Sequence, residues 1–465
     1  MLVFRAGLLF STIFLCALSG CDNDRVETET GESPVGVVDA GSSAGDASRP
    51  GPDGGSATGA DLPIIFVHGF AGSASQFESQ ALRFIANGYS KDKIRAFDHD
   101  GAGFDTASFL TGVDEYVNAA IKDFGVQKVY LVGHSRGTFV SSMYLGDAAR
   151  AAKIAKYVSL DGSGCAAAVT AGVPCIEPNQ ASLPGQKHVE VATSAESFAR
   201  MYDFFLGKAP TVTQIVKQSG PVEISGRVVN FPANTGRAGT TLDIYEVDSA
   251  TGARTTAPKV ATFSIAADGN WGPATVSPDK HYELAVSAPD TGTQHFYHQR
   301  FLRSSHLMRL LSGGSDSPAR VNTNASDKHA AITALRMREW TAADVLEVKS
   351  TTASGTGQPP VNAITPAAGT PAAGGMGASF LPIGLYIHDD AATPGVSSLA
   401  LLPYFSTQPF QSGVDIFLPA TEPTDGTITL TNFPRGDQSK PQVLNVPNWA
   451  SSKHSIAVVF ADYAQ

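Results

Sequence analysis

The sequence predicts an α/β domain, with a parallel sheet covered by helices on both faces, followed by an all-β half that forms a sandwich or a barrel. Two observations carry this prediction. Over residues 62–208, short continuous apolar runs alternate with helical patterns, as in strands buried on both faces of a sheet. After about residue 216, apolar and polar residues alternate instead, which is typical of half-buried antiparallel strands.

The α/β region, placed at residues 62–215, follows a regular order. The expected strands are 64–67, 94–97, 129–132 and 157–160, and helical patterns lie between them, including 114–124. Ser75 and Glu78 form an expected capping box for the first helix. Thr193 and Glu196 are expected to cap a last helix that stops at Gly207. Strands that alternate with helices predict a parallel sheet.

The all-β half is divided into two β-rich modules. Strand-like runs at 222–228, 242–247, 261–265 and 282–286 predict a β-sandwich module over residues 216–300. Residues 301–378 are expected to be a mixed segment, with helical patterning around His329 to Trp340 and then a Pro/Gly/Ala-rich linker. Runs at 383–387, 427–431 and 456–460 predict a second β-rich module over residues 379–465.

The first residues are typical of an export signal. Arg5 precedes an apolar run from Leu8 to Leu18 that is too short to span a bilayer comfortably. The run ends Leu18-Ser19-Gly20-Cys21, which resembles the lipobox of bacterial lipoproteins and implies a lipid on Cys21. We therefore expect a signal peptide over residues 1–20, a flexible tether over 21–61, and an exported chain anchored by lipid to the bacterial cell envelope. A cleaved secretory signal is the alternative.

Cysteine usage agrees with export. If Cys16 leaves with the signal and Cys21 carries a lipid, only Cys165 and Cys175 remain. Two thiols ten residues apart in an oxidising compartment are expected to form one disulfide that closes a short loop.

Charge and composition exclude some partners. Charged residues make up 16% of the chain, the formal net charge is −10, and no run of Lys or Arg offers a track for phosphates, so no nucleic-acid partner is expected. Asp389, Asp390, His295 and His298 lack a convergent third ligand in the sequence, so we expect no metal site.

The strongest motif is Gly133-His134-Ser135-Arg136-Gly137, directly after an apolar strand. It matches the G-x-S-x-G nucleophile elbow, which needs a strand before it and a helix after it. Glycines are needed at its ends because side chains there would clash in the tight turn. Ser135 is therefore the candidate nucleophile.

A serine nucleophile needs a base, and the base needs an acid that orients it. Asp161 follows the strand that ends at Leu160, and the first histidine after it is His188. The rival acid Asp147 is expected within the helix after the elbow and pointing elsewhere. We therefore predict Asp161 as the acid and His188 as the base. Only 26 residues separate them, which leaves little room for a large helical lid.

The segment Val67-His68-Gly69-Phe70-Ala71-Gly72 ends the first strand. Its small residues let the chain bend toward the nucleophile, so we assign the oxyanion hole to the backbone N–H groups of Phe70 and Arg136. His68 and His134 are expected to support the loop and the elbow.

Together, these motifs resemble the α/β-hydrolase lipases, in particular the group similar to the archaeal long-chain triacylglycerol lipase, which carries a C-terminal β-barrel for lipid binding. The resemblance covers residues 62–208, and weakly the string Ala267-Asp268-Gly269-Asn270-Trp271-Gly272-Pro273. It implies a small α/β-hydrolase that works without a cofactor, with a lipid or another ester as the substrate.

The resemblance implies a lipase that cleaves acylglycerols through an acyl-enzyme. Short-chain carboxylesterase and polyester or amide hydrolase activities remain open, because the same three residues cleave all of these bonds. An alternative of another class is a surface-anchored lipid- or glycan-binding module with a vestigial hydrolase.

Overall fold

The structure is a computed structural model that describes residues 61–315, 317–321, 324–364, 381–393 and 395–463. The expected signal peptide, Cys21 and the tether up to residue 60 lie outside these ranges. Within them, no helix is both long enough and apolar enough to cross a membrane.

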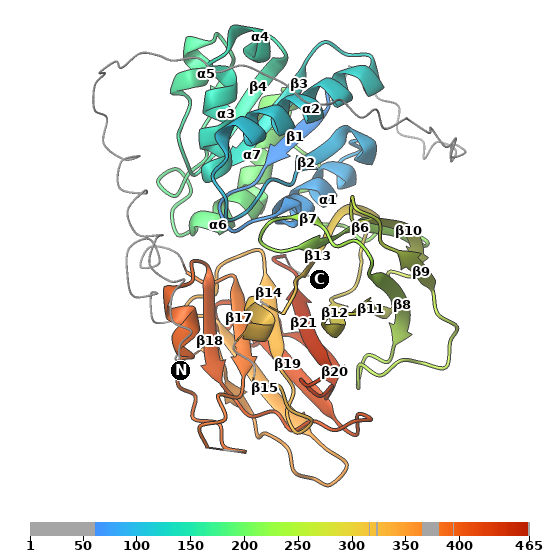
Figure 1. The fold of residues 1–465 in the computed structure, drawn as a ribbon. Helices are drawn as coiled ribbons and strands as arrows, with labels where there is room; N and C mark the ends of the chain where they lie inside the picture. Colours follow the sequence, from blue (N-terminus) through green and yellow to red (C-terminus); the bar gives the residue numbers. More distant parts are fainter. Residues whose placement is uncertain (1–60, 316, 322–323, 365–380, 394, 464–465) are drawn as a thin grey trace, which may run out of the picture. The chain divides into compact units, whose positions relative to one another are not determined.

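The first part of the described chain contains a five-stranded parallel sheet in the order β2-β1-β3-β4-β5 (Figure 1). Its strands are β1 (Ile64–Val67), β2 (Ile94–Phe97), β3 (Val129–His134), β4 (Ile154–Leu160) and β5 (Cys175–Ile176). The order of strands reverses between β1 and β3. Ligands of such sheets bind outside the carboxyl ends of the strands at this point of reversal.

Helices cover both faces of this sheet. They are α1 (Glu78–Ala86), α2 (Thr106–Phe124), α3 (Arg136–Leu145), α4 (Ala148–Ala151), α5 (Ala166–Thr170), α6 (His188–Thr193) and α7 (Ala195–Leu206), and the 3-10 turns η1 (Ala74–Phe77) and η2 (Lys91–Lys93) precede α1 and β2. Ile64 and Phe66 pack with α1 and α7, whereas Ile65 and Val67 pack with α2 and α3. Because successive residues of β1 face opposite cores, the strand is apolar throughout, as the sequence predicted.

The second half of the chain is all-β apart from short helical turns. Its strands are β6 (Val222–Asn230), β7 (Thr235–Gly236), β8 (Thr241–Val247), β9 (Ala261–Ser264), β10 (Asn270–Val276), β11 (His281–Ala288), β12 (Gly292–His298), β13 (Ser305–Ser312), β14 (Ile332–Arg336), β15 (Val345–Thr351), β16 (Val361–Asn362), β17 (Gly384–His388), β18 (Gln411–Asp415), β19 (Thr427–Phe433), β20 (Gln442–Pro447) and β21 (His454–Phe460). The turns are α8 (Pro318–Val321), η4 (Pro403–Thr407) and η5 (Pro434–Gly436).

One eight-stranded sheet joins the two expected β modules, in the order β18-β17-β14-β21-β12-β11-β8-β9. The parallel pairing of β12 with β21 connects residues 293–298 to residues 454–459. A sheet built on β10, β6 and β13 shares one apolar core with β8 and β11, and a sheet built on β16, β15, β19 and β20 shares another with β14 and β21. The all-β half therefore consists of two sandwich-like cores on one long sheet.

Three local expectations are wrong. The pattern around His329 to Trp340 is not a helix, because residues 332–336 form strand β14 inside the long sheet, and residues 301–378 contribute strands β13 to β16 to the sheets. Ser75 does not cap α1, whose N-cap is Phe77 without a side-chain hydrogen bond. The cap of α7 is Ser194, one residue after the expected Thr193.

Candidate active site

Ser135 lies between β3 and α3, at the point where the sheet order reverses. Its backbone has φ 52° and ψ −122°, a conformation that few residues with a side chain adopt. The Ser135 N–H donates to the Leu160 carbonyl at 3.1 Å, and the Ser135 carbonyl accepts from the Thr138 N–H at 2.9 Å. The strained turn is thus held in place by its neighbours, which is the arrangement expected of a nucleophile elbow.

The glycines of the motif are required by close approaches. A Cβ atom on Gly137 would lie 2.1 Å from the Val67 carbonyl oxygen, and one on Gly133 would lie 2.6 Å from the Gly137 carbonyl oxygen. A Cβ atom on Gly69 would lie 2.9 Å from the Ser135 Cβ atom. The loop after β1 therefore packs directly against Ser135. A side chain at Gly69 or Gly137 would push β1 and its loop away from the elbow, and one at Gly133 would distort the elbow itself.

Asp161 and His188 are brought together by the fold. Asp161 directly follows β4, the neighbour of β3 in the sheet, and has φ 43°. The His188 Nδ1 and Asp161 Oδ2 atoms lie 2.7 Å apart. Burial would raise the pKa of Asp161, but hydrogen bonds from His188 and Gln180 outweigh it and hold the pKa below its ordinary value. Asp161 is therefore charged at neutral pH and can orient the imidazole.

The other candidate acid, Asp147, has a structural role away from His188. It is the N-cap of α4, where its Oδ1 atom accepts from the Arg150 N–H at 2.9 Å.

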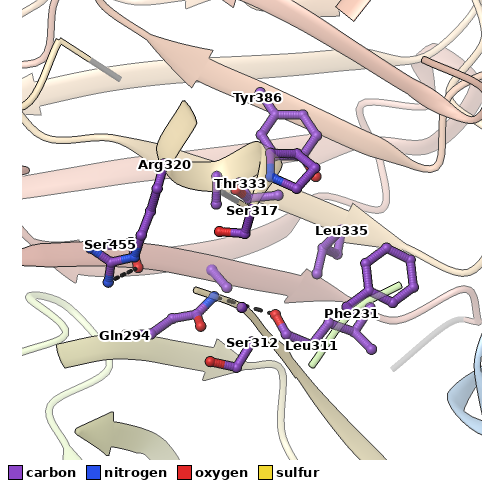
Figure 2. A pocket seen from close by; sticks show the side chains of 14 residues that line it. Phe231, Gln294, Leu311, Ser312, Ser317, Arg320, Thr333, Leu335, Tyr386 and Ser455 are labelled. Carbon is purple, nitrogen blue, oxygen red and sulfur yellow. Dashed lines mark hydrogen bonds between the residues drawn. The ribbon is translucent and has the colours of Figure 1, made fainter. Parts of the chain in front are cut away.

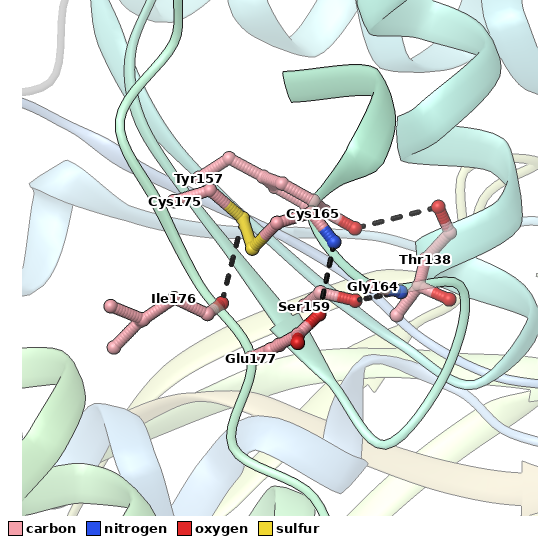
Figure 3. Close-up of a disulfide and its surroundings, with 8 residues drawn as sticks. All are labelled: Thr138, Tyr157, Ser159, Gly164, Cys165, Cys175, Ile176 and Glu177. Carbon is pink, nitrogen blue, oxygen red and sulfur yellow. Dashed lines mark hydrogen bonds between the residues drawn. A yellow bond between two sulfur atoms is a disulfide. The ribbon is translucent and has the colours of Figure 1, made fainter. Parts of the chain in front are cut away.

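Gln180 is a partner of Asp161 that sequence reasoning missed. Its side-chain Nε2 donates to Asp161 Oδ2 at 2.8 Å and its backbone N–H donates to Asp161 Oδ1 at 3.1 Å. The predicted disulfide between Cys165 and Cys175 is confirmed, and it closes the loop between these two residues (Figure 3). The disulfide holds Cys175 near Asp161, and Gln180 follows five residues later in the chain.

The side chain of Arg136 links the loop after β1, residues 68–72, to residues 99–103. This buried guanidinium donates to the Gly103 carbonyl at 2.6 Å and lies 5.3 Å from the centre of the Phe70 ring. Burial lowers the pKa of Arg136 to about 10, so it stays charged at neutral pH. The Arg136 N–H is the first of helix α3 and has no partner within the helix. Arg136 therefore contributes in two ways: its backbone N–H begins helix α3, and its side chain packs against Phe70.

Buried histidines support both loops, as the sequence predicted for His68 and His134. The His134 ring contacts Gln76 Nε2 at 2.7 Å and the His188 carbonyl at 2.9 Å. The His68 ring stacks on His99 with 3.7 Å between ring centres.

The β half also contacts the loops that follow β1 and β2. Asn234, between β6 and β7, donates from Nδ2 to the Gly72 and His99 carbonyls, each at 2.8 Å. Its φ of 57° is the left-handed conformation that asparagine tolerates. No local pattern in the sequence links residue 234 to residue 72.

An apolar pocket lies beside residues 71–73. The β half supplies the rest of its lining: Phe231, Leu311, Leu335, Met337, Ile383, Gly384, Tyr386, Pro409, Phe410 and Gln411. Phe410 also lies against His188, with 6.3 Å between ring centres. A second pocket shares Phe231, Leu311, Leu335 and Tyr386 with the first and extends to Arg320 and Ser455, which form a hydrogen bond of 3.2 Å (Figure 2). The two pockets therefore adjoin and lead away from the loop after β1.

The expectation that Asp389 and Asp390 lack a third ligand is wrong. Asp415, on the neighbouring strand, brings a carboxylate oxygen within 4.8 Å of theirs. These carboxylates already accept hydrogen bonds from loop groups, among them the N–H groups of Asp390, Ala391 and Ser398. Such contacts stabilise a loop without a cation.

Lowering the pH is expected to destabilise the protein through its buried histidines. Burial, reinforced by the nearby His188, lowers the pKa of His134 to about 3, and burial with Arg136 lowers that of His99 to about 4. The unfolded chain therefore binds these protons first, so the stability is present above pH 6.5 and is lost as the pH falls. Each histidine should remove about 1.4 kcal/mol of unfolding free energy per pH unit between pH 6 and 5, where the unfolded chain binds the proton and the folded chain does not.

Urea unfolding at pH 7, 6 and 5 measures this slope. His134→Gln should reduce it, since one of the titrating groups is gone. A free energy of unfolding that stays constant from pH 7 to 5 would contradict the prediction.

Comparison with known proteins agrees with this geometry. A family model of the alpha/beta hydrolase fold matches residues 63–210, and one of the lipase C-terminal domain matches residues 220–314. A third model, described as a C-terminal domain, matches residues 319–464.

Solved structures resemble the chain only distantly. An extracellular alpha/beta-hydrolase from a Paenibacillus species is 20% identical over 22% of this chain and 40% of its own, with a TM-score of 0.18. A lipase from Bacillus licheniformis, in its propeptide form, is 12% identical over 83% of this chain and 93% of its own, with a TM-score of 0.25. The match thus spans less than two thirds of the Paenibacillus chain.

Proposed function

We propose that the chain, which matches family models of the alpha/beta hydrolase fold and of the lipase C-terminal domain, is a serine esterase whose natural substrates are esters of long acyl chains, as in a lipase. The observation that carries the proposal is the hydrogen bond of 2.7 Å between Asp161 and His188, taken together with the strained backbone of Ser135. On the sequence grounds given above, the proposal includes export and a lipid on Cys21.

In the proposed mechanism, His188 takes the proton of Ser135 as the hydroxyl attacks the ester carbonyl. The N–H groups of Phe70 and Arg136 hold the oxyanion that forms, each contributing on the order of a hundred- to a thousandfold in rate. His188 then gives the proton to the leaving alcohol, and water hydrolyses the acyl-enzyme by the same steps. Asp161 keeps the imidazole in the required tautomer and balances its charge.

The apolar pocket supports a long acyl chain as the substrate group. It begins at Ala71 to Ser73, next to the proposed oxyanion hole, and its walls are mostly aliphatic and aromatic. Each methylene buried there contributes about 0.8 kcal/mol. The adjoining pocket beyond Leu311 continues in the direction away from the loop after β1.

We therefore expect activity on p-nitrophenyl esters to rise from acetate toward palmitate. Leu311 lines both pockets and is partly exposed, so a larger side chain can be introduced there. If Leu311→Trp excludes three methylenes, it should lower kcat/KM on palmitate about fiftyfold and leave acetate nearly unchanged. Steady-state kinetics across the chain lengths measure both values.

Val260→Trp, at an exposed position, is the matched control for adding an indole. A peak at acetate or butyrate in the unmodified protein would instead make it a short-chain carboxylesterase. No hydrolysis of any of these esters would favour an amide or polyester hydrolase, or the binding module with a vestigial hydrolase.

A further inference from the structure

Helix α6 begins with His188, and its N-cap side chain offers no acceptor to the first N–H groups of the helix, although Glu190 Oε2 accepts from the N-cap N–H of Lys187 at 3.2 Å. Its N-cap residue is Lys187, whose ammonium group has donors only. Helices α2 and α7 of the same domain carry their own acceptors: Asp105 accepts from two N–H groups of α2, and Ser194 accepts from the Ser197 N–H of α7. The first N–H groups of α6 therefore need an acceptor from another part of the chain.

Glu339, in the β half, supplies that acceptor. Its Oε1 atom accepts from the Val189 N–H, and its Oε2 atom accepts from the Glu190 N–H at 3.0 Å. The side chain is 1% exposed, so the two hydrogen bonds are shielded from water. Burial raises the pKa of Glu339, while these N–H groups and the nearby His188 act in the opposite direction.

Salt bridges fix the position of this acceptor relative to α6. Glu190 pairs with Arg338 at 3.0 Å and with Arg435 at 2.7 Å, both from the β half. Arg435 is held in turn by Asp344, through its backbone N–H at 2.8 Å and its guanidinium at 3.2 Å. The segment around Glu339 is therefore attached to α6 at several points.

We propose that Glu339 is a positioning residue, by which the β half holds His188 at the angle that hydrolysis requires. The inference rests on the proposed function, because it assigns His188 as the base. The imidazole must keep its hydrogen bond from Nδ1 to Asp161 while it accepts the proton of Ser135. A displacement of the imidazole by about 1 Å can lower the rate a hundredfold. Without the carboxylate, the first turn of α6 would lose two hydrogen bonds and could shift with His188.

The test is a series of Glu339→Gln, Glu339→Ala and Glu339→Asp in the full chain. With a soluble short-chain ester, Glu339→Ala should lower kcat at least tenfold with KM within about threefold, because alignment is lost rather than binding. Glu339→Gln keeps one acceptor and should lose less, and Glu339→Asp, which keeps the charge, should recover part of the rate. Glu347→Gln, on strand β15, is the control.

Hydrogen exchange separates positioning from general stability. In Glu339→Ala, faster exchange confined to residues 187–194 supports the proposal, whereas faster exchange throughout the α/β domain overturns it. A kcat within threefold of the unmodified protein also overturns it. If the unmodified protein shows no Ser135-dependent activity on any ester, the proposed function fails, and the exchange of residues 187–194 still supports or overturns the contact.

Discussion

Replacing Ser135 with alanine is expected to abolish ester hydrolysis, with kcat falling by about a millionfold. The hydroxyl is the only group that the proposed mechanism joins covalently to the acyl chain, so nothing else in the site can replace it. Hydrolysis of p-nitrophenyl esters by the chain beginning at Ala60 measures the loss.

The fold should survive this change. Ser135 makes its structural hydrogen bonds through its backbone, with Leu160 and Thr138, and alanine keeps both. Circular dichroism and the urea midpoint should therefore match the unmodified protein. Ser108→Ala, at an exposed position on α2, controls for losing a hydroxyl without touching the site. Full activity in Ser135→Ala would contradict the assignment of Ser135 as the nucleophile.

The sequence predicted the fold of the α/β domain well because its signals are local. Four apolar residues in β1 must face two cores, and the elbow needs glycines where the backbone of Val67 approaches. Chain order then selected Asp161 and His188, because loops that follow neighbouring parallel strands meet at one edge of the sheet. Each of these inferences uses residues close together in the sequence, or a rule about parallel sheets.

Long-range contacts could not be predicted in the same way. Asn234 holds the carbonyl of Gly72, and Glu339 holds helix α6, yet these partners lie more than a hundred residues apart. Nothing in the amino-acid pattern pairs them, since an asparagine in a turn and a glutamate near a tryptophan are common at surfaces.

The misassigned segment around His329 has a related cause. Residues 330–332 form an apolar run, and the successive residues Ile332, Thr333 and Ala334 are all buried, so β14 is covered on both faces. A buried strand and a buried helix cannot be told apart by a short apolar run alone. The deciding information is the position of β14 in the sheet, which depends on partners far along the chain.

Asp161→Asn is expected to lower kcat by about 10,000-fold while leaving KM nearly unchanged. An asparagine offers one acceptor oxygen where the carboxylate offers two. Asp161 Oδ1 accepts from the Gln180 N–H, and Oδ2 accepts from the Gln180 side chain and faces His188 Nδ1. If the amide oxygen serves the Gln180 N–H, the NH₂ group faces the imidazole and favours the tautomer that cannot accept the serine proton.

The experiment compares Asp161→Asn with Asp147→Asn in one ester assay. Asp147 is the other aspartate between Ser135 and His188 that the sequence offers, and asparagine can replace it as the cap of α4. Its variant should therefore stay near the activity of the unmodified protein. A loss of less than tenfold in Asp161→Asn would point to another acid, and a large loss in Asp147→Asn alone would mean that the hydrogen bond between Asp161 and His188 does not orient the base.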